Sequence, residues 1–209
     1  MNSSSGLHFI SSTTQVELTS LEEINSALSE IGAAVRPIDL KAAPNDLMKI
    51  VGQESLTVDE NQEVLEYFLL SRERLLEVID EAGRDPNVSG GGLLKTYVSN
   101  HDYWYPQLWV AQAGEDYSRF DRLHVNAADD GTGVDEVLQM VAGAGVTIVL
   151  QLENKSELTL DLACPDSESG WMITYNGGRP HIGSVSSAMP GTKLVTQVIG
   201  PESWQMRYV

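Results

Sequence analysis

Two short stretches, Phe120-Asp-Arg-Leu-His-Val-Asn126 and Gly170-Trp-Met-Ile-Thr-Tyr-Asn-Gly-Gly-Arg-Pro-His181, decide how this chain is interpreted. The first contains His124, the second ends in His181, and Glu136 lies between them. Imidazole and carboxylate groups are donors that bind divalent transition metals. If the strands that carry these three side chains lie side by side, the side chains can converge on one ion.

The sequence around both stretches is typical of an antiparallel sheet protein. From residue 93 onwards, short runs of β-forming residues recur at intervals of about 8–12 residues and are broken by Gly, Pro and Asp. The predicted strands are 93–99, 107–113, 120–126, 134–141, 146–152, 157–163, 171–175, 181–186, 192–199 and 203–208. Such a series predicts a β-sandwich or a β-barrel.

The first 92 residues differ, because helical periodicity dominates them. Ser20 with Glu23, and Thr57 with Glu60, form capping boxes before apolar residues at helical spacing. The predicted elements are a loose arm over 1–18 that ends in a short strand, a helix over 21–31, one helical turn over 45–51 and a long helix over 58–82. We therefore predict an α+β protein in which a helical region, residues 1–92, packs on a barrel of residues 93–209.

The residues after His124 resemble the first motif of the cupin superfamily, whose members fold as double-stranded β-helix (jelly-roll) barrels. That motif reads His-x-His, a few residues, Glu, six residues, Gly, and here six residues separate Glu136 from Gly143. Asn126 replaces the second histidine of the motif. The resemblance implies a cupin-type barrel for the second half of the chain.

The segment that ends in His181 resembles the second cupin motif, which reads Gly, five residues, Pro-x-Gly, two residues, His. Gly170, Asn176-Gly-Gly178 and His181 keep this spacing, with Asn in place of Pro. Within the superfamily the chain resembles 3-hydroxyanthranilate dioxygenase, in which one His, one Glu and a second His bind Fe(II). The matching segments are Leu108-Trp-Val-Ala-Gln112, Arg119-Phe-Asp121, His124, Asp135-Glu136, Gly143 and Pro180-His181.

This resemblance implies roles for five residues. His124, Glu136 and His181 would hold the metal, and Arg119 or Arg122 would receive a carboxylate of the substrate. His101 lies in a run of aromatic residues that could line a pocket for a planar ligand or cover the mouth of the barrel. It is our third candidate catalytic side chain, beside the two arginines.

Three assignments in this region stay open on the sequence. Asp130 competes with Glu136 as the carboxylate ligand, because it lies at the usual motif distance from Asn126. The amide of Asn126 could be a fourth ligand or could orient a bound water. Thr132 could cap a helix through residue 140, but the alternation from 134 to 140, together with the cupin resemblance, favours a strand.

The donor types restrict the chemistry more than they restrict the metal. Two histidines and one carboxylate leave adjacent positions open, which suits Fe(II) that must bind both O₂ and a substrate. Mn, Ni, Co and Zn accept the same donors, so the donor types alone do not identify the metal. Fe(II) is our first choice of cofactor, as the resemblance implies. We predict a metal-dependent enzyme for small molecules, in its sharpest form a dioxygenase of a hydroxylated or carboxylated ring. The alternatives are an isomerase or lyase, and a barrel that binds a small molecule or a partner without chemistry.

Composition excludes several classes of partner. The net charge of −17 argues against nucleic acid and against an anionic membrane, because both need clustered Lys and Arg. No apolar run approaches the roughly 20 residues of a membrane span, and the first residues lack the features of a signal peptide. The one cysteine, Cys164, cannot form an internal disulfide. We predict a cytoplasmic protein, and the resemblance implies a homodimer.

Overall fold

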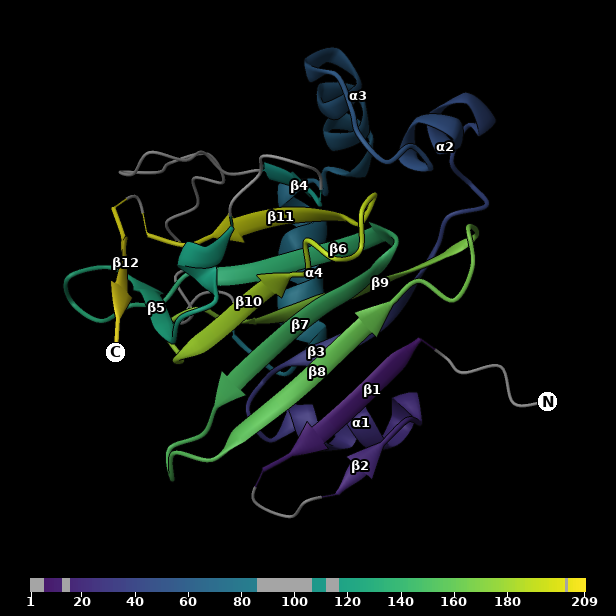
Figure 1. The fold of residues 1–209 in the computed structure, drawn as a ribbon. Helices are drawn as coiled ribbons and strands as arrows, with labels where there is room; N and C mark the ends of the chain where they lie inside the picture. The colour runs from purple at the N-terminus through teal and green to yellow at the C-terminus, as the bar shows by residue number, and fades with distance from the viewer. Residues whose placement is uncertain (1–5, 13–15, 86–106, 112–116, 202) are drawn as a thin grey trace.

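Two antiparallel sheets form the centre of the computed structural model, which describes residues 6–12, 16–85, 107–111, 117–201 and 203–209 (Figure 1). The strands are β1 (Leu7–Ser11), β2 (Glu17–Leu18), β3 (Ala34–Asp39), β4 (Gln107–Val110), β5 (His124–Ala127), β6 (Asp135–Ala142), β7 (Ala144–Gln151), β8 (Glu157–Ala163), β9 (Ser169–Asn176), β10 (His181–Val185), β11 (Lys193–Ile199) and β12 (Gln205–Tyr208). One sheet has the order β12-β5-β10-β7-β8-β1-β2, and the other has the order β3-β9-β6-β11-β4.

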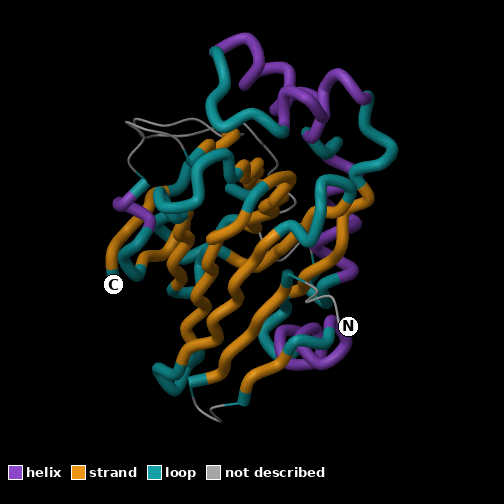
Figure 2. Tube along the Cα trace, turned by 45° about the vertical axis from the view of Figure 1, so that its right-hand side comes forward, coloured by secondary structure: helices purple, strands orange, loops and turns teal. Residues whose placement is uncertain are grey.

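The helices are α1 (Leu21–Ser29), α2 (Asn45–Val51), α3 (Val58–Phe68), α4 (Arg72–Glu81) and the short 3₁₀ helix η2 (Ser118–Phe120). Figure 2 shows the α-helices beside the strands, and Ile24 and Leu28 of α1 pack in the core between the two sheets. Side chains of α2 and α3 pack on β4, β6 and β11, and side chains of α4 pack on β6 and β11. Helices therefore cover the outer face of the five-stranded sheet.

The main core lies between the two sheets, where their inner faces meet. Strand β6 shows how the two layers use alternate residues. Leu138 and Met140 pack in the core between the sheets, whereas Val137 and Val141 pack under the helices. Both faces of β6 are covered, so almost every residue in it is buried.

The region expected to hold one long helix over 58–82 contains two helices. Helix α3 ends at Phe68, and the side chain of Ser71 accepts a hydrogen bond from Arg74 N to begin α4. Gln197 of β11 fixes the break, because its amide accepts from Leu70 N at 2.9 Å and donates to Leu70 O at 3.1 Å. The prediction of a single helix was therefore wrong, since the apolar pattern continues through a break that a distant glutamine stabilises.

The first 92 residues also contribute strands to both sheets, of which the sequence interpretation predicted only the short strand at the end of the arm, found as β2. β1 pairs with β8, and β3 pairs with β9 at the edge of the five-stranded sheet. Pro37 lies within β3, where an edge position tolerates a residue that has no N–H donor. The α+β character is confirmed, but a purely helical region over 1–92 is not, and the division at residue 92 stays a prediction.

Most of the predicted strands after residue 107 are found with small shifts of their ends, but the strand predicted over 120–126 begins only at His124, after the 3₁₀ helix η2 that ends at Phe120. The contested segment 132–141 is strand β6, so the helix that Thr132 could have capped does not form. The strand predicted over 93–99 lies outside the described residues. None of the described helices has the length and apolar character that a membrane span requires.

Candidate metal centre

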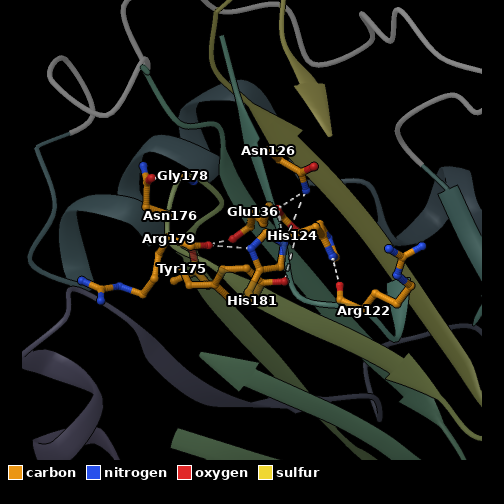
Figure 3. A network of polar contacts seen from close by, with 10 residues as sticks. Arg122, His124, Asn126, Glu136, Tyr175, Asn176, Gly178, Arg179 and His181 are labelled. Atoms are coloured by element: carbon orange, nitrogen blue, oxygen red, sulfur yellow. Dashed lines mark hydrogen bonds and ion pairs between the residues drawn. The ribbon is translucent and has the colours of Figure 1, made fainter. Parts of the chain in front are cut away.

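The two histidines of the predicted site face each other across one sheet. His124 begins β5, His181 begins β10, and the two residues are directly paired in the antiparallel register. Their ring centroids lie 4.3 Å apart. Side chains of directly opposite residues point to the same face of a sheet, so both imidazoles enter the space between the sheets. Figure 3 shows Glu136 and Asn126 reaching the same space.

The backbone fixes the protonation of both imidazoles in the same way. His124 Nδ1 lies 2.7 Å from Arg122 O, and His181 Nδ1 lies 2.8 Å from Arg179 O. A carbonyl oxygen only accepts hydrogen bonds, so each Nδ1 carries a proton. In the neutral ring Nε2 then keeps its lone pair, which is the state in which histidine binds a metal.

Glu136 supplies the carboxylate from β6, on the facing sheet. Its Oε1 accepts a hydrogen bond from Asn126 Nδ2 at 2.8 Å and lies 3.2 Å from His181 Nε2. Its Oε2 accepts from the Tyr175 hydroxyl at 3.0 Å. A carboxylate oxygen and an imidazole lone pair repel each other at such a distance. A cation must therefore lie between Glu136 and His181, either a proton on Nε2 or a metal ion.

The electrostatics of the cluster follow from burial and from this pairing. Burial raises the pKa of Glu136, but the charge and hydrogen bond of His181 and the hydrogen bond from Asn126 outweigh it and bring the pKa below its usual range. Burial lowers the pKa of His181, but Glu136 and the Arg179 carbonyl raise it overall. Burial and the neighbouring His181 lower the pKa of His124 to about 4. His124 is therefore neutral at physiological pH.

Asn126 occupies the position of the missing second histidine. Its amide nitrogen lies 3.4 Å from His181 Nε2 as well as 2.8 Å from the carboxylate of Glu136. The side chain is buried, and Oδ1 has no hydrogen-bond partner among the described residues. A buried polar oxygen without a partner is uncommon and calls for a physical reason.

The walls of the site are apolar, and the space inside it is small. The cavity has a volume of about 10 Å³ between the described residues, which is room for one ion or one water. Its other lining residues are Trp109, Phe120, Leu138, Tyr175, Gly183 and Thr196. Gly177 closes one side, because an added Cβ would lie 2.5 Å from Glu136 Oε1. The result is a small, buried site with one carboxylate.

The donor set fits a divalent transition metal in kind. Two Nε2 atoms, one buried carboxylate and one buried amide oxygen without a partner are nitrogen and oxygen donors that such ions accept. Within the described part of the chain, however, no three His, Cys, Asp or Glu side chains are already arranged as a formed metal site. Glu136 instead turns to Asn126, Tyr175 and His181, so a metal would compete with these contacts.

The carboxylate next to Glu136 points the other way. Asp135 Oδ1 accepts from Arg84 Nε at 2.8 Å, on the face of β6 that the helices cover. Arg84 also donates to Thr174 Oγ1 at 2.7 Å and to Gly32 O. This buried network ties the end of α4 to the two central strands, and it faces away from the histidines.

The remaining candidates lie in different places. Asp130 is exposed in a turn, where its carboxylate accepts from Thr132 N, so it does not join the histidines. Arg122 is exposed, with its guanidinium 3.9 Å from the centre of the Tyr208 ring, and Arg119 is exposed in η2. Neither arginine is among the described residues that line the site. Their catalytic role stays a prediction, and His101 lies outside the described residues.

Two residues of the site, Tyr175 and Gly177, were missed by the sequence interpretation. Both lie in the second quoted stretch, between Gly170 and His181. The alternation of Trp171, Ile173 and Tyr175 in the core places the Tyr175 hydroxyl on the inner face of β9. That alternation was available in the sequence, but which carboxylate it would meet was not.

The sequence matches no known family model and no curated protein. Among solved structures, the chain is similar to acireductone dioxygenase from Bacillus anthracis, which has a cadmium ion in its active centre. The two share 12% sequence identity, the TM-score is 0.63, and the match covers 98% of this chain and 99% of the other. This chain has a cupin-like fold. At this identity the likeness establishes the fold alone, and it gives no support to the finer resemblance to 3-hydroxyanthranilate dioxygenase.

The cupin-like fold explains why distant residues meet in one place. Its two facing sheets bring together His124 and His181 from one sheet and Glu136 and Tyr175 from the other. The extra residues between Asn126 and β6 form the turn that holds Asp130. The turn moves Asp130 away from the site, and Glu136 takes the place that the motif spacing would have given to Asp130.

Proposed function

We propose that this protein is a metal-dependent enzyme of cupin type that acts on a small molecule, with His124, Glu136 and His181 as protein ligands. The observation that carries the proposal is the approach of His181 Nε2 to Glu136 Oε1 at 3.2 Å in a buried site, beside a neutral His124. Fe(II) is the proposed metal, and a dioxygenase is the proposed reaction class. A cytoplasmic homodimer belongs to the same proposal.

Each side chain has a definite task in this proposal. When bound, the metal would supply a Lewis-acid or redox centre for the substrate. The Arg122 and Arg179 carbonyls hold the two imidazoles with Nε2 turned inward. Tyr175 holds the second oxygen of Glu136, which orients the carboxylate. The apolar walls exclude water and strengthen every electrostatic interaction inside.

One observation favours a second candidate, a barrel that binds its ligand without chemistry. The cavity between the described residues has a volume of about 10 Å³, which is room for an ion or a water but is too small for an organic substrate. A substrate must reach the metal if the protein is an oxygenase, an isomerase or a lyase. Turnover of a substrate by the metal-loaded protein would exclude the second candidate, and metal binding without turnover would favour it.

Metal titration tests the ligand assignment directly. We expect close to one divalent ion per chain, and we expect His124→Ala, His181→Ala and Glu136→Ala each to weaken binding by more than about tenfold. Asp130→Ala is the matched control, since it removes a carboxylate of the same segment that lies in an exposed turn. Equal losses for Asp130→Ala and Glu136→Ala would contradict the assignment. Absence of binding in the unaltered protein would contradict the proposed function itself.

A further inference from the structure

Asn126 is the residue that distinguishes this site from the usual motif with two histidines. It lies in β5, two positions after His124, and its side chain enters the same space. The backbone of Asn126 is held on both sides, because its N–H donates to Gly177 O at 2.7 Å and its carbonyl accepts from Val134 N at 3.0 Å. Only the side chain is therefore free to change its contacts.

In the present structure, the NH₂ group of this amide has polar contacts, whereas its oxygen has none among the described residues. The NH₂ group donates to the Glu136 carboxylate at 2.8 Å and lies 3.4 Å from Nε2 of His181. The oxygen is buried and unpartnered among the described residues. The NH₂ group of the amide is thus directed toward the atoms that a metal would use. The amide oxygen, which is the better metal donor, has no contact in the described part of the chain.

A bound cation would favour the opposite orientation of the Asn126 amide. Glu136 Oε1 and His181 Nε2 would then face the metal, and the positive NH₂ group would face a like charge. Rotation of the amide plane exchanges the nitrogen and the oxygen without moving the backbone, because the two atoms occupy nearly equivalent positions. The rotation turns the oxygen toward the cation and removes the unfavourable contact.

We propose that Asn126 provides an amide-oxygen ligand to the bound metal and thereby sets the metal preference of the site. This inference rests on the proposed function and adds a fourth protein donor to it. Amide and carboxylate oxygens suit Mn²⁺, whereas imidazole suits Zn²⁺ and Ni²⁺. Replacing one imidazole by an amide therefore shifts relative affinity away from Zn²⁺ and toward Mn²⁺.

The test compares Mn²⁺ and Zn²⁺ affinities of three proteins by chelator competition at one pH. We expect Asn126→Ala to weaken Mn²⁺ binding by about tenfold or more and Zn²⁺ binding by less. We expect Asn126→His to strengthen Zn²⁺ relative to Mn²⁺ by about tenfold or more, since it supplies a third imidazole. Circular dichroism and melting of the metal-free proteins show whether each variant is folded.

Tyr175→Phe is the matched control, because Tyr175 touches the same carboxylate but is not a proposed ligand. Loss of the Tyr175 hydroxyl should weaken the binding of Mn²⁺ and of Zn²⁺ by a similar factor. If Asn126→Ala also weakens both metals equally, Asn126 only positions Glu136 and the inference is wrong. If Asn126→Ala binds Mn²⁺ as the unaltered chain does, the inference is also wrong, while the proposed function stands. If the unaltered chain binds neither metal, both fail together.

Discussion

Asp135 and Glu136 are consecutive carboxylates that the protein buries on opposite faces of β6 and neutralises in different ways. Asp135 lies under the helices and pairs with Arg84, a cation that keeps its proton at any physiological pH. Glu136 lies between the sheets and pairs with His181, whose proton can leave. The first pair keeps its charge, and in the proposed function the second exchanges its proton for a metal.

The difference shows how one strand can contribute both to the stability of the fold and to the candidate metal centre. Burial raises the pKa of Asp135 to about 6 even though Arg84 lowers it, so that carboxylate depends on its partner to stay charged. The pKa of Glu136 is lowered instead, because histidine and amide donors surround it. The carboxylate paired with arginine connects parts of the fold, and in the proposed function the one paired with histidine binds a cation.

The largest expected effect comes from breaking the Asp135 pair. Arg84→Met leaves a buried carboxylate without its cation, which should lower the free energy of unfolding by about 3–5 kcal/mol. Urea unfolding of the metal-free protein measures it. Arg74→Met is the control, because Arg74 forms exposed pairs with Glu77 and Glu81 and should cost less than about 1 kcal/mol. Equal costs for both variants would show that the Asp135 pair does not hold the fold together.

A third buried charge, Lys193, extends the comparison to a cation that has no carboxylate partner among the described residues. Its side chain is fully buried, and Nζ donates to the carbonyls of Gln53 and Gly191. Burial lowers its pKa from the ordinary 10.5 to about 8. Between these values the unfolded chain binds more protons than the folded one, so stability should rise as pH increases from about 8 to 10.5.

The expected rise is about 3 kcal/mol, because each unit of this pKa difference corresponds to about 1.4 kcal/mol. Lys193→Met should remove the rise and should be more stable than the unaltered protein below about pH 8. Unfolding free energies of both proteins across this pH range provide the measurement. Parallel pH curves for the two would mean that Lys193 keeps an ordinary pKa.

The smallest effect concerns the Glu136 pair. Tyr175→Phe removes one hydrogen bond to Oε2, which should cost about 1 kcal/mol of metal-free stability. The same change should reduce metal affinity by about tenfold, because the carboxylate loses its orientation. Melting and metal titration of one preparation give both numbers. A large stability loss with unchanged metal affinity would make Glu136 structural, like Asp135.

Local patterns in the sequence predicted most strands and the convergence of His124, Glu136 and His181, whose role as metal ligands stays a prediction. Alternation placed Glu136, Leu138 and Met140 on one face of β6, and motif spacing joined His124 to His181. Sequence reasoning failed where a distant partner decides. The break between α3 and α4 depends on Gln197, which lies far along the chain.

Two further features were beyond sequence reasoning for the same reason. The pairing of β1 with β8 joins the first residues to a strand that follows them by about 150 positions in the numbering, and strand pairing at such separation leaves no local pattern. The partner of Asp135, Arg84, comes from the end of a helix in the region that had been assigned separately from the barrel. Charge types are visible in a sequence, but their pairing is not.

The donors of the proposed centre are divided between the two sheets, with His124 and His181 on one and Glu136 on the other. A bound ion would therefore connect the two sheets of the sandwich. An ion that joins the two sheets would oppose local opening of the core between them. Amide hydrogens of β5 and β10 would then exchange with solvent more slowly in the loaded protein, at a rate set by the ion and not by the strands alone.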